Sequence, residues 1–157
     1  MSWLPYAVAA MASAGILYAG YKLTELGPWY RDLKKPSWQP PDWLFGPAWT
    51  TIFALTTWAV GLAWNLVPEA AMHTQIVWLF AANGVFNILW SLLFFKLRRP
   101  DWALREVPLL WLSVLGLILV FAGPVPKAAW LMVPYLAWVS FAAYLNRTII
   151  RLNGSFT

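Results

Sequence analysis

Five long stretches of the chain are almost free of charged residues, and short polar stretches separate them. A helix that crosses a bilayer needs about 20 mostly apolar residues, and each stretch is long enough. The approximate spans are 3–22, 43–67, 70–95, 104–122 and 127–148. The pattern therefore predicts an all-α membrane protein in which residues 1–157 form one domain, a five-transmembrane-helix bundle.

Proline and glycine mark the breaks between these stretches. Only the connection between the first two spans, roughly residues 22–42, is longer than the about 2–8 residues usual between packed helices. Pro36, Pro40 and Pro41 lock φ and remove backbone donors, so this segment is predicted to be a long, stiff Trp/Pro-rich loop. The loop either covers the mouth of the bundle as a lid or places its indoles at headgroup level as an interfacial belt.

Composition favours lipid as the solvent. Hydrophobic residues make up 61% of the chain and charged residues 11%, whereas soluble domains carry about 25% charged residues. The net charge is +5, but the basic residues lie between apolar runs, so they indicate topology and contacts to anionic lipid rather than to nucleic acid. The chain has no cysteine, which excludes disulfides, thiolate catalysis and cysteine metal sites.

Lysine and arginine predict the orientation. They gather in the first and third connections and in the tail: Lys22, Arg31, Lys34, Lys35, Lys96, Arg98, Arg99, Arg105, Arg147 and Arg151. The second connection has none and the fourth has only Lys127. Because cytoplasmic loops carry an excess of these residues, the amino terminus is expected outside and the carboxyl terminus in the cytoplasm.

Residues three and four positions apart share one face of a helix, and three stripes of aromatic, amide or small residues follow this spacing. They are Trp49 and Phe53; Asn83, Phe86, Asn87 and Trp90; and Tyr135, Trp138, Ala142 and Asn146. Polar groups within a span tend to face the bundle. Trp138 lies about 15 Å along its helix from Ala128, deeper than an interfacial tryptophan. The stripes predict an apolar, aromatic-lined ligand pocket with a few amides; the alternative is helix packing with amide hydrogen bonds across helices.

Residues for classical catalysis are sparse. The single histidine, His73, lies near the outer start of the third span and is expected to be an interfacial polar group rather than a haem ligand. The acids fall in or beside connections, so no buried carboxylate pair offers a relay for proton-coupled transport: Glu25, Asp32, Asp42, Glu69, Asp101 and Glu106. No phosphate loop or nucleophile triad is present, and no metal site or required cofactor is expected.

Several unusual residues occur together in "WYRDLKKPSWQPPDWLFGPAW" (29–49), "FNILWSLLFF" (86–95) and "VPYLAWVSFAAYLN" (133–146). These segments resemble the signature of the translocator protein family, also called tryptophan-rich sensory proteins (TspO/MBR) or peripheral benzodiazepine receptors. The resemblance covers 29–146 and implies a five-helix membrane protein, often a homodimer, found in bacterial and mitochondrial outer membranes. It implies binding of porphyrins and haem and, in many members, of sterols and benzodiazepine-type drugs. A bacterial membrane is expected here.

The resemblance also implies a ligand site. It places the ligand among Tyr30, Pro40, Trp49, Phe53, Asn87, Trp90, Trp138 and Ala142, to which the helical spacing adds Asn83, Phe86 and Tyr135, and the lid adds Trp38. Lys34 and Lys35 either meet ligand carboxylates or orient the loop at the lipid surface. Asn83 stands where many relatives have glutamine, and Trp90 where others have phenylalanine. Arg147 follows Leu145-Asn146 where the vertebrate sterol motif has tyrosine, so sterol is not expected to be the native ligand.

Three functions remain. The favoured one is a membrane receptor or sensor that binds porphyrins such as protoporphyrin IX or haem and regulates tetrapyrrole metabolism or a stress response. The second is a light- and oxygen-dependent porphyrin-degrading enzyme, because Trp49 and Trp138 match the pair implicated in that reaction in some bacterial members. The third is a transporter of porphyrin or sterol, although the spans lack the inverted repeats typical of secondary transporters.

Overall fold

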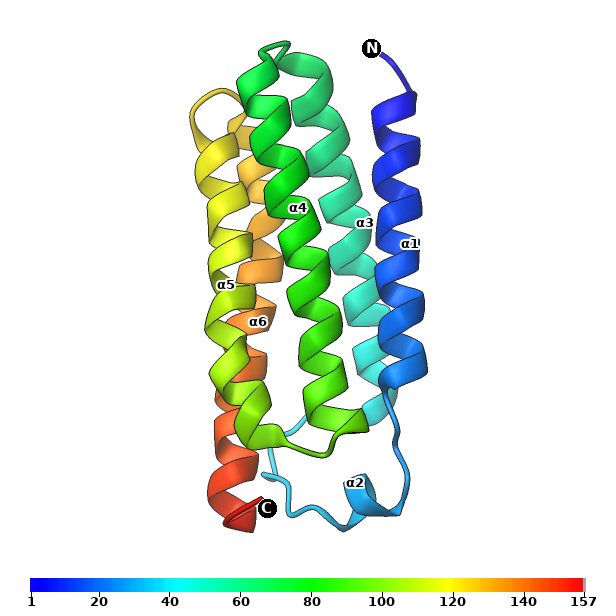
Figure 1. Cartoon of the computed structure of the whole chain (residues 1–157), viewed down its shortest axis with the longest axis vertical. Helices are drawn as coiled ribbons and strands as arrows, with labels where there is room; N and C mark the ends of the chain where they lie inside the picture. Colours follow the sequence, from blue (N-terminus) through cyan, green and yellow to red (C-terminus); the bar gives the residue numbers. More distant parts are fainter. Residues whose placement is uncertain (157) are drawn as a thin grey trace.

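Helices make up almost all of the computed structural model, which describes residues 1–156. The long helices are α1 (Leu4–Leu23), α3 (Asp42–Leu66), α4 (Ala70–Ser91), α5 (Pro100–Ala122) and α6 (Pro126–Asn153). A short helix, α2 (Pro28–Asp32), lies between α1 and α3, and a π-helical segment, η1 (Leu92–Lys96), continues α4. The long helices lie side by side in one bundle, with α2 beneath one end (Figure 1). Residues 1–156 contain no strand, so the predicted all-α class is confirmed.

Within residues 1–156, four helices are long and apolar enough to cross a membrane: α1, α4 with η1, α5 and α6. The prediction counted five such helices. The 25 residues of α3 carry a single charge, that of Asp42, but they are rich in tryptophan, threonine and glycine. Such residues add little to mean hydropathy, so length and composition mark four spans. The boundaries also differ, because α5 begins at Pro100 rather than at 104 and α6 continues to Asn153.

The connection between α1 and α3 is not the uninterrupted loop that its prolines suggested, because it contains α2. Pro28 occupies the first turn of α2, where its missing N–H costs nothing. Leu33 is extended and ends the helix. Residues 34–41 contain no further helix before α3 begins.

Glycine brings three helix pairs into close contact. A Cβ at Gly61 of α3 would overlap the ring of Tyr6 on α1, and one at Gly84 of α4 would lie 2.8 Å from Cδ1 of Ile16. A Cβ at Gly116 of α5 would lie 3.0 Å from a methyl group of Leu79. Small residues at helix crossings are typical of bundles in lipid, where backbones approach closely.

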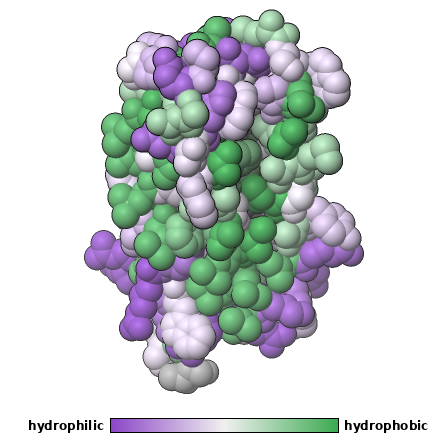
Figure 2. All heavy atoms as spheres, turned by 45° about the horizontal axis from the view of Figure 1, so that its top comes forward, coloured by the Kyte–Doolittle hydropathy of each residue, from purple (hydrophilic) through white to green (hydrophobic). Residues whose placement is uncertain are grey.

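The surface of the bundle is divided by polarity. Hydrophobic side chains form a band across the middle of the visible face, and hydrophilic ones gather toward both ends (Figure 2). The connections that hold nearly all the cations lie at the end where the carboxyl terminus lies, opposite the amino terminus (Figure 1). We call this the cationic end. Large apolar side chains such as Met11, Trp78 and Trp130 are more than 70% exposed, which suits a protein surrounded by lipid.

The first helix is the least enclosed. Only 11% of the most apolar part of α1 is buried, compared with 28–39% for the other three apolar helices. Its contacts are with α3, α4 and η1. Most of α1 therefore faces outward, although Gly61 and Gly84 let it approach α3 and α4 closely.

Candidate functional site: a cavity inside the helix bundle

A cavity of about 530 Å³ lies between α1, α3, α4 and α6, and α2 closes part of it. This volume falls in the range of about 300–1,000 Å³ that is usual for small-molecule sites. Most of its lining is apolar or aromatic, with a few polar side chains such as Asn87, Asn146 and Gln39.

The cavity brings together seven of the residues predicted for the ligand site: Tyr30, Trp49, Phe53, Asn87, Trp90, Trp138 and Ala142. The other five, Trp38, Pro40, Asn83, Phe86 and Tyr135, do not line it. Asn83 and Tyr135 are buried in the helix packing instead. Trp38 packs outside the cavity against Tyr144 and Phe141 of α6. Contact between these twelve residues and a ligand stays a prediction.

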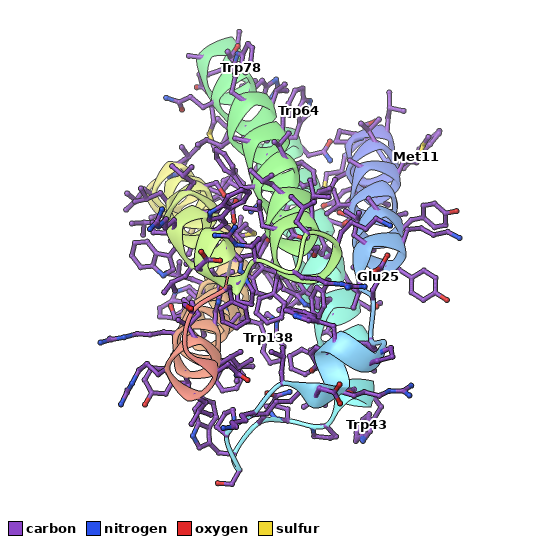
Figure 3. The ribbon with its side chains drawn as sticks, turned by 60° about the horizontal axis from the view of Figure 1, so that its bottom comes forward. Met11, Glu25, Trp43, Trp64, Trp78 and Trp138 are labelled. Carbon is purple, nitrogen blue, oxygen red and sulfur yellow. The ribbon has the colours of Figure 1, made fainter. Side chains whose placement is uncertain are left out.

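Two indoles from separate helices meet in the cavity wall. The ring centroids of Trp49 on α3 and Trp138 on α6 lie 6.3 Å apart, and the ring planes are at 88°. Phe53 stacks on Trp49, and Phe45 contacts Trp138 edge to face. Trp138 lies within the space that the helices enclose, whereas Trp43 points away from the bundle (Figure 3). Edge-to-face is a favoured arrangement of aromatic rings, so these contacts stabilise an aromatic wall.

Behind this wall, a chain of hydrogen bonds joins α4, α5 and α6. The Asn87 amide nitrogen donates to the Tyr135 hydroxyl at 2.9 Å, and that hydroxyl donates to Asn83 Oδ1 at 3.2 Å. Asn83 Nδ2 donates to the Ser113 hydroxyl, which donates to the Leu110 carbonyl at 2.6 Å. A backbone carbonyl can only accept, so the Leu110 end fixes the donor direction along the whole chain.

The fixed direction decides which end of the Asn87 amide is free. Its nitrogen is committed to Tyr135, whereas its carbonyl oxygen accepts no hydrogen bond within residues 1–156. Asn87 lines the cavity, so this oxygen is one acceptor that is available to a ligand. The neighbouring amide, Asn146, is used at both ends, because Oδ1 accepts from Trp90 and Nδ2 donates to the Pro100 carbonyl.

At the cationic end, Tyr30 of α2 closes the cavity. Its hydroxyl donates to Asp42 at 2.9 Å and accepts from Gln39 at 3.0 Å. Burial, followed by the hydrogen bond to the Asp42 carboxylate, raises the pKa of Tyr30 above its usual value. The ammonium group of Lys35 lies 4.3 Å from the centre of the Tyr30 ring and donates to the Tyr30 carbonyl. Tyr30 therefore stays a neutral donor, held by three neighbours.

The connection is fastened to the end of α6. The Lys34 backbone N–H donates to Asn153 Oδ1 at 2.9 Å, and Asn153 Nδ2 donates back to the Lys34 carbonyl at 2.9 Å. The indole of Trp38 stacks on Tyr144 with centroids 5.4 Å apart. Trp43 is 71% exposed, as an interfacial tryptophan would be. The connection thus combines features of both alternatives, since Tyr30 covers the cavity while Trp43 faces outward.

Sequence reasoning missed the contribution of α1 to the cavity. This helix supplies Ile16, Leu17, Tyr18, Gly20 and Tyr21, and Thr24 follows directly after it. It has no buried amide or aromatic stripe to mark one face, so nothing in its pattern indicated a lining. Phe45 and Ile149 could have been found, because Phe45 lies four residues before Trp49 and Ile149 lies seven after Ala142 on the same helix faces.

His73 does not line the cavity. Its ring stacks on Trp64 at 3.8 Å, and Nε2 is within hydrogen-bonding distance of the Val67 and Trp64 carbonyls at the end of α3. In these contacts it joins the end of α3 to the start of α4. A histidine in this role is a structural polar group.

Residues 6–152 match the model of the TspO/MBR family. The chain belongs to this family. It is 42% identical over 129 residues to the tryptophan-rich protein TspO of Chlorobaculum tepidum, a match that covers 80% of this chain and 79% of that protein. It is 34% identical to the tryptophan-rich sensory protein of Cereibacter sphaeroides, over 98% of this chain and 94% of that one. It is 32% identical to the human translocator protein, over 80% and 75% of the two chains.

Membership of the TspO/MBR family agrees with the four apolar helices, and both identify an integral membrane protein. The family match includes all or nearly all of each helix, and it covers the less apolar α3 and the short α2 completely. The predicted resemblance is thereby confirmed. The cavity lies entirely within the matched region.

Proposed function

We propose that this protein is a membrane receptor or sensor that binds porphyrins, such as protoporphyrin IX or haem, in the cavity of the bundle. The observation that carries the proposal is the perpendicular contact between Trp49 and Trp138 in the cavity wall. A flat aromatic guest can stack on one indole while its edge meets the other. Aromatic walls with a few polar groups are the usual lining of such sites.

The polar groups of the cavity fit a macrocycle that enters with its apolar edge first. The free Asn87 oxygen at the inner wall would repel a carboxylate, whereas the cationic end lies beside Tyr30 and Lys35. Propionate groups would therefore stay at the cationic end, where the Lys35 ammonium group can exchange its backbone carbonyl partners for a carboxylate. Lys34 is exposed and adds positive charge there.

In this proposal α3 also crosses the bilayer, which gives five spans. It runs beside α1 and α6 and has 25 residues, enough to cross about 30 Å of hydrocarbon. The cationic end faces the cytoplasm and the amino terminus lies outside, because cytoplasmic connections are enriched in lysine and arginine. Partners are the lipid bilayer and hydrophobic ligands, with sterols and benzodiazepine-type drugs as competitors for the same cavity.

Tryptophan fluorescence tests the proposal. Protoporphyrin IX added to the purified protein in detergent or nanodiscs is expected to quench the fluorescence saturably, with a dissociation constant in the micromolar range or below. Free tryptophan at the same absorbance corrects for inner-filter loss. Quenching that rises linearly without saturation, as in empty nanodiscs containing free tryptophan, would reject a defined site.

A second function, light-dependent porphyrin degradation, is favoured by the same pair of indoles. Tryptophan can be oxidised next to a photoexcited porphyrin in the presence of oxygen, and here two oxidisable rings lie in contact. Illumination of the complex in air is expected to give a new coloured product that requires both Trp49 and Trp138. If the porphyrin bleaches at the same rate without protein, degradation is rejected as a function and the receptor function remains.

A further inference from the structure

Among the acidic side chains of residues 1–156, only that of Glu106 is buried. It lies in the second turn of α5 and is 6% exposed, and neither carboxyl oxygen has a hydrogen-bond partner within residues 1–156. The sequence had placed this residue beside a connection. The correction follows from the earlier start of α5 at Pro100, which carries Glu106 into the bundle.

Other acids have partners at the surface. Glu25 pairs with Lys96 at 2.9 Å, and Asp42 accepts from Tyr30 at 2.9 Å. Asp101, on the same helix as Glu106, pairs with Arg99 at 2.6 Å.

The helices packed around α5 bring no cation to Glu106. Helix α4 has His73 as its only ionisable side chain, at the opposite end, and faces α5 with neutral amides. Helix α6 contributes one buried ionisable side chain, Tyr135, whose hydroxyl is already used by Asn83 and Asn87. Arg105, which is next to Glu106 on α5, is exposed. The other ionisable side chains of η1 and α6 are exposed as well: Lys96, Lys127, Tyr144, Arg147 and Arg151.

An ionised carboxylate that is buried without a partner is strongly disfavoured, so something must neutralise it. A metal cation requires several oxygen or nitrogen ligands, and residues 1–156 contain no cluster of three metal-binding side chains. An organic cation would need access, but each Glu106 oxygen exposes less than 1 Å². A proton is the one neutralising group that needs neither ligands nor space.

We propose that Glu106 is a proton-binding site and that its carboxyl group is neutral in the folded bundle. Glu106 lies seven residues before Ser113 on the same face of α5, close to two helical turns. It therefore belongs to the α5 face that packs against the hydrogen-bonded chain ending at Asn87. Release of the proton would draw water or a counter-ion between α4, α5 and α6, immediately behind the cavity wall.

Infrared spectroscopy tests the site without any ligand, so its outcome is independent of porphyrin binding. The protein in nanodiscs at neutral pH is expected to show the C=O stretching band of a protonated carboxyl group. The band should be lost in Glu106→Gln, which keeps the size of the side chain, and retained in the control Glu25→Gln, which alters an exposed ion-paired acid. Retention of the band in Glu106→Gln, or its absence in the unmodified protein, would overturn the proposal.

A second measurement decides the question if Glu106→Gln does not fold. The unmodified protein is titrated from neutral to alkaline pH while the same band is followed. A buried proton should persist at neutral pH and disappear, together with cooperative helix packing, only in alkali. A carboxyl band that is already absent at neutral pH in the folded protein rejects the site.

Discussion

The indole of Trp138 meets the indole of Trp49 edge to face inside the bundle, with ring centroids 6.3 Å apart and planes at 88°. These residues lie on α6 and α3, 89 positions apart in the chain (138 − 49). Ala142, one turn after Trp138, also lines the cavity and leaves the space beside the pair open.

Two changes at this pair should weaken porphyrin binding. Trp138→Phe removes stacking area, and Ala142→Leu fills the space beside it, so each is expected to raise the dissociation constant at least about 10-fold, or ~1.4 kcal/mol. The measurement is fluorescence quenching by protoporphyrin IX. Trp78→Phe is the matched control, because Trp78 is 72% exposed on α4 and far from the cavity lining. Equal affinity in all three variants would show that the ligand binds elsewhere.

The hydrogen-bonded chain behind the cavity should be sensitive to the loss of its central hydroxyl. Tyr135→Phe leaves Asn87 Nδ2 and Asn83 Oδ1 without partners, and each buried unpaired group costs about 1–3 kcal/mol. Ser113→Ala leaves only Asn83 Nδ2 unpaired. Thermal unfolding in detergent is therefore expected to show a larger loss for Tyr135→Phe than for Ser113→Ala. The reverse order would contradict the central position assigned to Tyr135 in the chain.

Asn153 should control how firmly the connection covers the cavity. Asn153→Ala removes both hydrogen bonds to Lys34. The ligand is therefore expected to dissociate faster, by a factor of about 5–10 for roughly 1–1.4 kcal/mol of lost hydrogen bonding. Stopped-flow displacement of the porphyrin measures this rate.

Asn65 provides a matched control for Asn153. At the opposite end of the bundle it makes the same pair of bonds, to the backbone N–H and carbonyl of Ser2. Asn65→Ala should leave the dissociation rate unchanged. An equal acceleration in both variants would indicate general loosening of the bundle rather than opening of the connection.

Glycine positions should differ sharply in their tolerance of a methyl group. Gly84→Ala places a Cβ 2.8 Å from Ile16 and is expected to destabilise the bundle by about 1–3 kcal/mol through overpacking. Gly15, in the middle of α1, meets nothing within 4 Å. Gly15→Ala should be neutral or stabilising by up to about 1 kcal/mol, because alanine favours helix more than glycine does. Denaturant or thermal titration compares the two.

Much of the fold could be predicted because long apolar runs and proline breaks act locally. The uncharged stretch before Lys22 and the break at Gly123-Pro126 correspond to the ends of α1 and α5. The count of apolar spans was harder, because α3 carries only the charge of Asp42 and yet is not among the helices that are apolar enough to cross a membrane. Helix α2 was missed because its five residues, which begin at Pro28, are too few to show a helical period.

The cavity was predictable where a stripe of unusual residues follows helical spacing, as for Trp138 and Ala142. It was not predictable for α1, whose lining residues differ little from those that face lipid. The spacing also could not show that Asn83 and Tyr135 satisfy one another behind the wall, because a buried amide looks the same whether it faces a ligand or a neighbouring helix. Glu106 was misplaced because its burial depends on where α5 begins.

The overlap between a Cβ at Gly61 and the ring of Tyr6 has an evolutionary consequence. The two positions share a single volume, so a bulkier residue at one requires a smaller residue at the other. Among divergent members of the family, substitutions at positions 6 and 61 are therefore expected to be correlated. A chain with the small residue at position 6 and the large residue at position 61 should restore the crossing of α1 and α3.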